Sequence, residues 1–183
     1  NQMAPFNKYT PNKYPVGCAA TAGAIVMQYH GYPAKGTGSH SYKWDGKTLT
    51  AQFEHEYDWA NMPARYDGTN AADFDGVARL MSDLGVAVDM QYTEDGSGSY
   101  ISDLVAAMQK YFGYSKISHQ MSIEAGSAEE WNEKLRGEID ANRPVLYAAF
   151  DSIGGGHAFV IDGYKDDSFS VNWGWGGLCN GFY

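Results

Sequence analysis

The order of the secondary-structure patterns along this chain restricts its fold more than any other feature. Three strand patterns lie together in the last third, at residues 144–150 (PVLYAAF), 157–164 (HAFVIDGY) and 169–175 (FSVNWGW), and the KDDS between the last two is typical of a hairpin turn. The longer patterns before residue 140 have helical periodicity instead. Helices followed by an antiparallel sheet, without βαβ alternation, predict an α+β fold.

The helical patterns carry local start and stop signals. From Cys18 onward an apolar stripe recurs with helical spacing, and Gly31 and Pro33 supply a stop; the stripe consists of Ala22, Ile25, Val26 and Tyr29. A second helix is predicted near residues 71–84, with Gly85 after it, and a third over 101–112, with Gly113 after it. A fourth is predicted to begin at the capping box Ser127–Glu130.

Three remaining segments receive weaker predictions. Residues 1–17 are rich in turn-forming residues and predict an ordered but irregular arm. Residues 34–70 show no lasting period, so we expect a long irregular excursion. The alternating VAVDM of residues 86–90 predicts a short strand, followed by a turn at 94–99.

The bulk composition describes one globular domain. The chain has 183 residues, 44% hydrophobic and 19% charged, which is enough for a single core and too apolar for a disordered protein. The formal net charge of −9 argues against a nucleic acid partner. No apolar run reaches the roughly 18–20 residues of a membrane span. Because the chain opens at Asn1 without a Met, we expect a product from which a leader has been removed.

Cys18 has two interpretations, and the chain around it does not decide between them. It lies at the start of a predicted helix, where unpaired N–H groups and the helix dipole stabilise a thiolate. A free cysteine is also among the most buried residue types and packs like a small hydrophobic residue. Taken alone, Cys18 favours the packing role. The only other cysteine is Cys179, so the two thiols either form one disulfide or both remain free.

A cysteine nucleophile needs a base, and His157 is the best candidate among the five histidines. It follows three glycines and opens an apolar strand, in which a buried imidazole without a polar role would be costly. A hydrogen-bonded core histidine remains the alternative. The other four fall at a helix end or in irregular segments, where capping or surface roles are the simpler expectation: His30, His40, His55 and His119.

The next strand offers a residue to orient that base. If 169–175 is antiparallel to the strand of His157, we expect the Asn172 amide to meet an imidazole nitrogen, with Trp173 and Trp175 covering the contact. The alternative is that the tryptophans and glycines only close the sheet. Gln2, in the N-terminal arm, could donate to an oxyanion, although a solvated Gln is the ordinary expectation there.

Four of these segments recur together in one known family. They are the arm beginning NQ, the GCAAT…YHGYP helix, GGHAFVIDGY and VNWGWGG, and they closely resemble the streptopain family of bacterial cysteine peptidases. YDWANMPARY, LMSDLGVAVDMQY, YFGYS, HQM and NRPVLY follow in the family's order and spacing. The resemblance therefore covers nearly the whole chain.

The resemblance implies a papain-like fold with the active site in a cleft between two halves. Residues 1–183 would form a single catalytic domain, helix-rich over about 1–140 and sheet-rich over about 141–183. The family is bacterial, secreted and associated with virulence, and it is made as a zymogen whose propeptide blocks the cleft. Its substrates are proteins or peptides, with a preference for a bulky hydrophobic residue at P2.

The resemblance also assigns roles to individual residues. Cys18 matches the nucleophile and His157 the general base. Gln2 matches the oxyanion-hole glutamine, and Asn172 and Trp173 match the residues that position the histidine. Contacts to the substrate are implied for Ser97, Gly98, Ser99 and Gly156, and we place Trp175 with them.

Two features depart from the family pattern. Members continue well past GGxxxGFF, whereas this sequence stops at Tyr183, so we expect a core without the C-terminal extension. Cys179 stands where the family usually has no thiol, and a disulfide between Cys179 and Cys18 would silence the enzyme.

Three functions are open to such a chain. The first is a cysteine endopeptidase in which the Cys18–His157 dyad forms a thioester with the substrate. The second is an amidase or transpeptidase acting on peptidoglycan peptides, and the third is a peptide-binding module without turnover. No cofactor is implied, and the absence of HExxH or CxxC spacing predicts no metal site.

Overall fold

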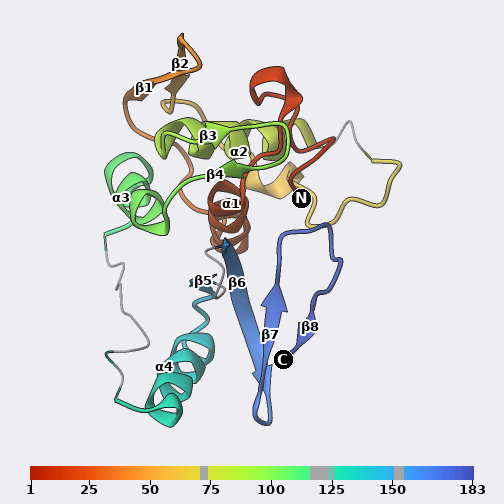
Figure 1. The fold of residues 1–183 in the computed structure, drawn as a ribbon, viewed down its shortest axis with the longest axis vertical. Helices are drawn as coiled ribbons and strands as arrows, with labels where there is room; N and C mark the ends of the chain where they lie inside the picture. The colour runs from red at the N-terminus through yellow and green to blue at the C-terminus, as the bar shows by residue number, and fades with distance from the viewer. Residues whose placement is uncertain (71–73, 116–123, 125, 151–154) are drawn as a thin grey trace.

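The computed structural model describes residues 1–70, 74–115, 124, 126–150 and 155–183. Three helices and two short strand pairs occupy one half, and a fourth helix and a four-stranded sheet occupy the other (Figure 1). This arrangement confirms the α+β class predicted from the order of the patterns. Within the described residues, no helix is both long enough and apolar enough to cross a membrane.

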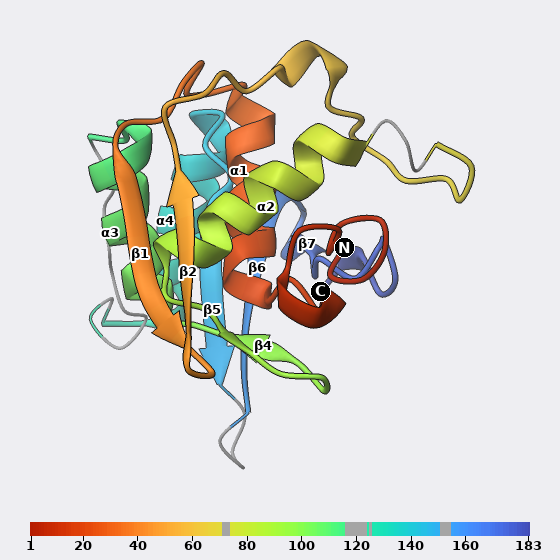
Figure 2. The ribbon, with the colours of Figure 1, turned by 90° about the horizontal axis from the view of Figure 1, so that it is seen from above.

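Helix α1 (Cys18–His30) lies at the centre of the molecule. Its first turns consist of small residues, and Ala19 and Ala20 are completely buried, so neighbouring elements approach its backbone closely. The helix ends at Gly31, which adopts the left-handed conformation (φ 55°) typical of a C-terminal cap. Helix α2 (Asp75–Ala87) crosses α1, and α3 (Ile101–Phe112) packs beside both (Figure 2).

The sheet is antiparallel, and its two faces contact different helices. Its strand order is β5 (Val145–Phe150), β6 (Gly156–Lys165), β7 (Ser168–Asn172) and β8 (Gly181–Phe182). Ala158 and Val160 of β6 belong to the core around α1, whereas Phe159 and Ile161 pack with residues of α4 (Ala128–Asp140). Side chains in a strand alternate between faces, so the odd-numbered residues in this part of β6 point away from α1. The predicted cap of α4 is present, since Ser127 Oγ accepts from the Glu130 N–H at 3.1 Å.

The prediction of an irregular segment over residues 34–70 is wrong for its first part. Residues in this segment form a hairpin of β1 (Ser39–Trp44) and β2 (Lys47–Gln52). Asp45 and Gly46 connect the strands with φ values of 46° and 70°, which is the pattern of a type I′ turn. The Asp-Gly pair in the sequence is a signal for a hairpin turn. The prediction missed it because polar residues on the outer face of both strands make the segment read as irregular. The 3₁₀ turn Trp59–Asn61 follows the hairpin, and another, Pro11–Lys13, lies in the irregular N-terminal arm.

The predicted strand at residues 86–90 is also wrong. Helix α2 continues to Ala87, and the residues that alternate in the sequence are nearly all buried, including Val86, Val88 and Met90. Gly85 lies inside the helix, where a side chain would collide with the Tyr92 hydroxyl. Two short strands follow, β3 (Gln91–Tyr92) and β4 (Ser97–Gly98), paired with each other. The start of the helix predicted near residue 71 falls at residues 71–73, which lie outside the described residues.

Candidate active site

Cys18 is the first residue of α1 and is partly exposed. The preceding Gly17 has φ 93° and ψ 143°, a backbone conformation that glycine adopts far more readily than other residues. The Gly17 carbonyl accepts from both the N–H (3.1 Å) and the hydroxyl (2.9 Å) of Thr21, which fixes the first helical turn. A thiol in this position lies at the positive end of the helix dipole. Within the described part of the chain, the Cys18 thiol makes no hydrogen bond and no disulfide, and Cys179 is free and exposed.

Strand β4 lies directly beside the start of α1. A Cβ atom on Gly17 would be 2.6 Å from Met90 Sδ and 3.0 Å from the Ser97 carbonyl oxygen. The Ser97 hydroxyl is buried without a hydrogen-bond partner among the described residues. The Ser99 hydroxyl donates to the Val88 carbonyl at 2.7 Å, so this side chain is already engaged. The structure therefore brings two of the predicted substrate-contacting residues, Ser97 and Gly98, to the side of the molecule where α1 begins at Cys18.

The N-terminal arm also lies beside the residues that lead into α1. The Gln2 carbonyl accepts from the Val16 N–H at 2.9 Å, which puts the backbone of Gln2 beside the residues that lead into α1. The Asn1 backbone nitrogen donates to the Gly174 carbonyl, and Asn1 Oδ1 accepts from the Gly176 N–H at 2.7 Å. The arm is thus held on one side by the segment before Cys18 and on the other by the loop after β7.

His157 is the second residue of β6 and lies among aromatic rings. Its Nε2 is 2.9 Å from the Trp173 carbonyl oxygen. A carbonyl can only accept, so Nε2 carries a hydrogen, and in the neutral imidazole Nδ1 then has the lone pair that a general base requires. The imidazole centroid is 4.8 Å from Trp175, 6.0 Å from Trp173 and 6.1 Å from Phe159.

Asn172 does not make the contact expected of it. In the observed register Asn172 pairs with Val160, on the face of the sheet toward α1, whereas His157 shares the opposite face with Phe159. Asn172 lines a cavity of about 220 Å³ with Val160 and Ile25, and its Oδ1 accepts from the Gly174 N–H at 3.1 Å. No hydrogen bond joins Asn172 to His157 in the described structure. The backbone of Trp173 takes the place predicted for the Asn172 amide.

The loop after β7 links the histidine to the helix of the cysteine. Trp173 holds His157, and the next residue, Gly174, is so close to Thr21 that a Cβ would lie 2.8 Å from its methyl group. Gly174 has φ 74°, a conformation that glycine adopts without strain. Neither the Trp173 carbonyl nor Gly174 could be identified from the sequence as part of a site, because backbone groups carry no residue-type signal. Trp173 Nε1 is buried without a hydrogen-bond partner among the described residues.

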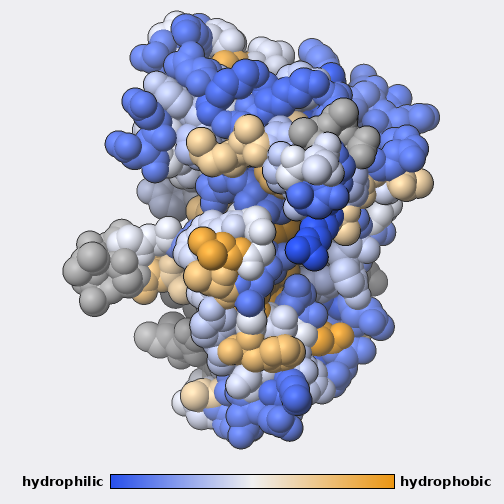
Figure 3. Space-filling view, turned by 90° about the vertical axis from the view of Figure 1, so that its right-hand side faces the viewer, coloured by the Kyte–Doolittle hydropathy of each residue, from blue (hydrophilic) through white to orange (hydrophobic). Residues whose placement is uncertain are grey.

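The remaining predicted residues lie at the edge of this region. The Phe150 ring covers Gly156, where a Cβ would be 2.8 Å from a ring carbon. Trp175 is 45% exposed beside His157. On the face where β7 and β8 lie, apolar surface occurs in separate patches among hydrophilic residues (Figure 3).

Two of the other histidines form ion pairs elsewhere, and His30 is exposed as the last residue of α1. His40 pairs with Asp89 and His55 with Asp83, at 2.7 and 2.8 Å. His119 falls outside the described residues. Among the residues that the structure describes, no group of three or more His, Cys, Asp or Glu side chains could hold a metal ion.

Comparison with known proteins gives matches over the full length of the chain. The peptidase C10 family matches residues 1–183. Streptopain of Streptococcus pyogenes is 33% identical over an alignment that includes 100% of this chain and 52% of streptopain. The thiol protease/hemagglutinin PrtT of Porphyromonas gingivalis is 34% identical, with 100% of this chain and 22% of PrtT aligned. The chain therefore spans about half the length of streptopain and less of PrtT.

Solved structures agree with these matches. Active interpain A, a cysteine protease of Prevotella intermedia, has a TM-score of 0.91 and 37% identity, and the match covers 100% of this chain and 81% of interpain A. A prointerpain A fragment from the same organism has a TM-score of 0.88 and 37% identity, with 100% of this chain and 62% of the fragment covered. This similarity confirms the papain-like α+β fold expected from the sequence.

Proposed function

The chain belongs to the peptidase C10 family, and from that premise we propose that it is a cysteine endopeptidase whose nucleophile is Cys18 and whose general base is His157. The observation that carries the proposal is the hydrogen bond from His157 Nε2 to the Trp173 carbonyl. This bond leaves Nδ1 as the proton acceptor, while the Gly174 contact with Thr21 ties the same loop to the helix that begins at Cys18.

The reaction begins with transfer of the Cys18 proton to His157 Nδ1. The thiolate, stabilised by the N-terminus of α1, attacks the carbonyl carbon of the scissile peptide bond. The Cys18 N–H and the Gln2 side-chain amide donate to the oxyanion that forms. His157 then protonates the leaving amine, and a thioester remains on Cys18.

A water molecule completes the cycle. His157 takes a proton from the water, the resulting hydroxide attacks the thioester carbonyl, and the thiolate leaves as the carboxylic acid product departs. The carbonyl of Trp173 stabilises the imidazolium that forms in both halves of the reaction, because it accepts from Nε2 throughout.

The substrate is a protein or peptide bound in extended conformation against β4. Gly98 has no side chain and nothing within 4 Å of its Cβ position, so it would not block a peptide backbone. Phe150, beside Gly156, and Trp175, beside His157, present exposed aromatic surface. Apolar surface of this kind suits a bulky hydrophobic residue at P2.

Maturation and location form a further part of the proposal. Prointerpain A, whose solved fragment has the same fold, is by name a precursor. By analogy, the protein is secreted by a bacterium as a zymogen, and its propeptide inhibits it by covering the site until it is removed.

The test is covalent labelling of Cys18 together with hydrolysis of a denatured protein. A peptidyl electrophile with a hydrophobic P2 residue should modify Cys18 and not Cys179, and Cys179→Ser should react at the parent rate. Cys18→Ala should lose labelling and hydrolysis while its thermal midpoint stays close to that of the parent. Hydrolysis that survives in Cys18→Ala would overturn the mechanism.

Two other results would replace the proposal. Cleavage of peptidoglycan peptides without cleavage of denatured protein would indicate the amidase or transpeptidase. Reversible peptide binding without reaction at Cys18 would indicate a binding module.

A further inference from the structure

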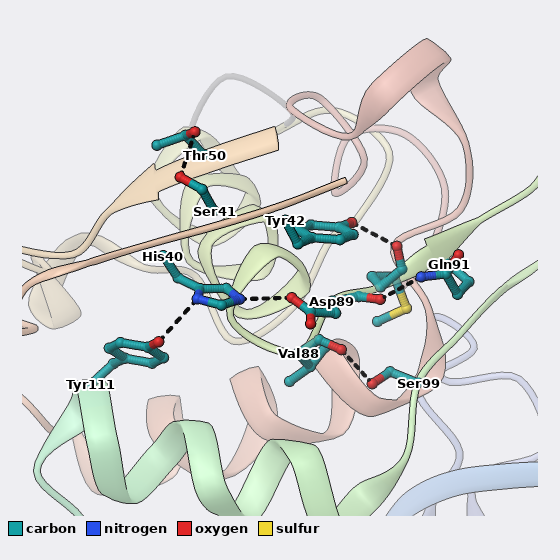
Figure 4. Close-up of polar contacts among 10 residues, drawn as sticks. His40, Ser41, Tyr42, Thr50, Val88, Asp89, Gln91, Ser99 and Tyr111 are labelled. Atoms are coloured by element: carbon teal, nitrogen blue, oxygen red, sulfur yellow. Dashed lines mark hydrogen bonds and ion pairs between the residues drawn. The ribbon is translucent and has the colours of Figure 1, made fainter. Parts of the chain in front are cut away.

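The turn of residues 88–90, between α2 and β3, lies behind the proposed substrate-binding strand. It has an unusual backbone, since Asp89 has φ 51°, and hydrogen bonds from the Asp89 and Met90 N–H groups tie it to the end of α2. Figure 4 shows that side chains from β1 and α3, together with Ser99, converge on this turn.

On one side, the turn contacts the residue that precedes α1. The Met90 side chain is completely buried, and its sulfur and methyl group would lie 2.6 and 2.7 Å from a Cβ on Gly17. The Ser97 carbonyl would be 3.0 Å from the same Cβ. Met90 and β4 therefore rest together against the residue that precedes Cys18.

The same turn also supports β4. Gln91 and Tyr92 of β3 pair with Gly98 and Ser97 of β4. The Ser99 hydroxyl adds a hydrogen bond to the Val88 carbonyl. Strands of two residues have few ladder hydrogen bonds of their own, so the position of β4 depends on what holds β3 and the turn.

Alternate residues of β1 supply that support. The Tyr42 hydroxyl donates to the Met90 carbonyl at 2.6 Å, and Trp44 Nε1 donates to the Tyr92 carbonyl at 3.0 Å. His40 Nε2 lies 2.7 Å from Asp89 Oδ1, and its Nδ1 lies 3.1 Å from the Tyr111 hydroxyl. Side chains two residues apart in a strand share one face, so the inner face of β1 is directed at residues 89–92.

These contacts differ in how firmly they hold the turn. The His40–Asp89 pair is partly exposed, and such pairs contribute little because water competes with them. The bond from Tyr42 is buried. Burial raises the pKa of Tyr42, and Tyr92 and Asp89 act in the same direction, so the hydroxyl stays protonated and remains a donor.

We propose that Tyr42 is a positioning residue of the active site, which acts through Met90 and β3 to hold substrate-binding strand β4 at its distance from Cys18. The inference rests on the proposed function, since it assigns β4 to the substrate. Cys18 itself is held independently, because the first turn of α1 is packed in the core and bonded through Thr21. Loss of the Tyr42 hydroxyl therefore displaces β4 and leaves the nucleophile in place.

The test compares two reagents on Tyr42→Phe, which keeps the ring and removes the hydroxyl. With Cys179 replaced by Ser in every variant, iodoacetamide reacts with the Cys18 thiolate without contacting β4, whereas a peptidyl electrophile must also bind along β4. We expect Tyr42→Phe to lower the labelling rate with the peptidyl electrophile about tenfold, the kinetic equivalent of one buried hydrogen bond. Its rate with iodoacetamide should remain within about twofold of the parent. In hydrolysis, the loss should appear as a raised KM with little change in kcat.

Ser41→Ala is the matched control. Ser41 is the neighbour of Tyr42 on β1, and its hydroxyl bonds Thr50 Oγ1 at 2.8 Å on the exposed face (Figure 4). This variant should match the parent with both reagents. His40→Ala removes a second, partly exposed support of the same turn and should lower only the peptidyl rate, by about threefold. It provides the test if Tyr42→Phe does not fold.

The outcomes separate this inference from the proposed function. If the parent labels normally and Tyr42→Phe labels at the parent rate with both reagents, Tyr42 does not position the site. An equal loss with both reagents would place the effect at the thiol and would also overturn the inference. If the parent itself fails to react with the peptidyl electrophile, the proposed function is wrong and the inference falls with it.

Discussion

Gly17→Ala is the substitution whose cost the structure defines most closely. Gly17 has φ 93° and ψ 143°, which other residues rarely adopt, so backbone strain alone would cost about 1–3 kcal/mol. The new Cβ would also lie 2.6 Å from Met90 Sδ and 3.0 Å from the Ser97 carbonyl. Forcing a methyl group into such packing adds about 1–3 kcal/mol. We expect Gly17→Ala to lower the free energy of unfolding by about 2–6 kcal/mol.

Two further variants separate strain from packing. Gly46 in the β1–β2 turn has φ 70° and nothing within 4 Å of its Cβ position, so Gly46→Ala reports strain alone, at about 1–2 kcal/mol. Met90→Ala removes the side chain that Gly17→Ala would strike. In the Met90→Ala background, Gly17→Ala should therefore cost about 1–3 kcal/mol less than it does in the parent.

Urea unfolding followed by tryptophan fluorescence measures all of these free energies. Gly17→Ala should be clearly less stable than Gly46→Ala, and the Met90 cycle should show a coupling energy well above about 0.5 kcal/mol. If Gly17→Ala costs no more than Gly46→Ala, or if the cycle shows no coupling, the close packing of Met90 against Gly17 is not a determinant of stability.

Two other predictions concern the proposed general base and a buried carboxylate. Asn172→Ala should lower kcat/KM for peptide hydrolysis less than His157→Ala does, because the Asn172 side chain bonds the Gly174 N–H and not the imidazole; equal losses would contradict this placement. Burial raises the pKa of Asp83, which accepts from His55 and Tyr57. The stability that Asp83 contributes is therefore fully present below its unfolded pKa of about 4 and is lost as pH rises through the higher folded value. Asp83→Asn should flatten this decline in urea midpoints measured from pH 3 to 7, and parallel pH profiles would show that Asp83 does not cause it.

Local chemistry was sufficient to predict much of the fold. The helix from Cys18 to the stop at Gly31 follows from apolar spacing and from a glycine that tolerates positive φ. The Ser127 cap follows from a side chain that can accept from its own helix. The strand wrongly predicted at residues 86–90 shows the limit of such reasoning. Alternation predicts a strand only when one face meets water, and here nearly every residue is buried.

A candidate nucleophile and a candidate base could be chosen from residue type and local pattern alone: a cysteine at a helix start and a histidine that opens an apolar strand. The groups that surround these two residues depend on how the strands pair and pack. Strand register turned Asn172 toward α1 and left the His157 ring to the Trp173 carbonyl. Register depends on contacts between strands that are separate in the sequence, and a backbone carbonyl is present in every residue. For this reason the residues proposed for the site could be named from the sequence, while the carbonyl that accepts from His157 could not.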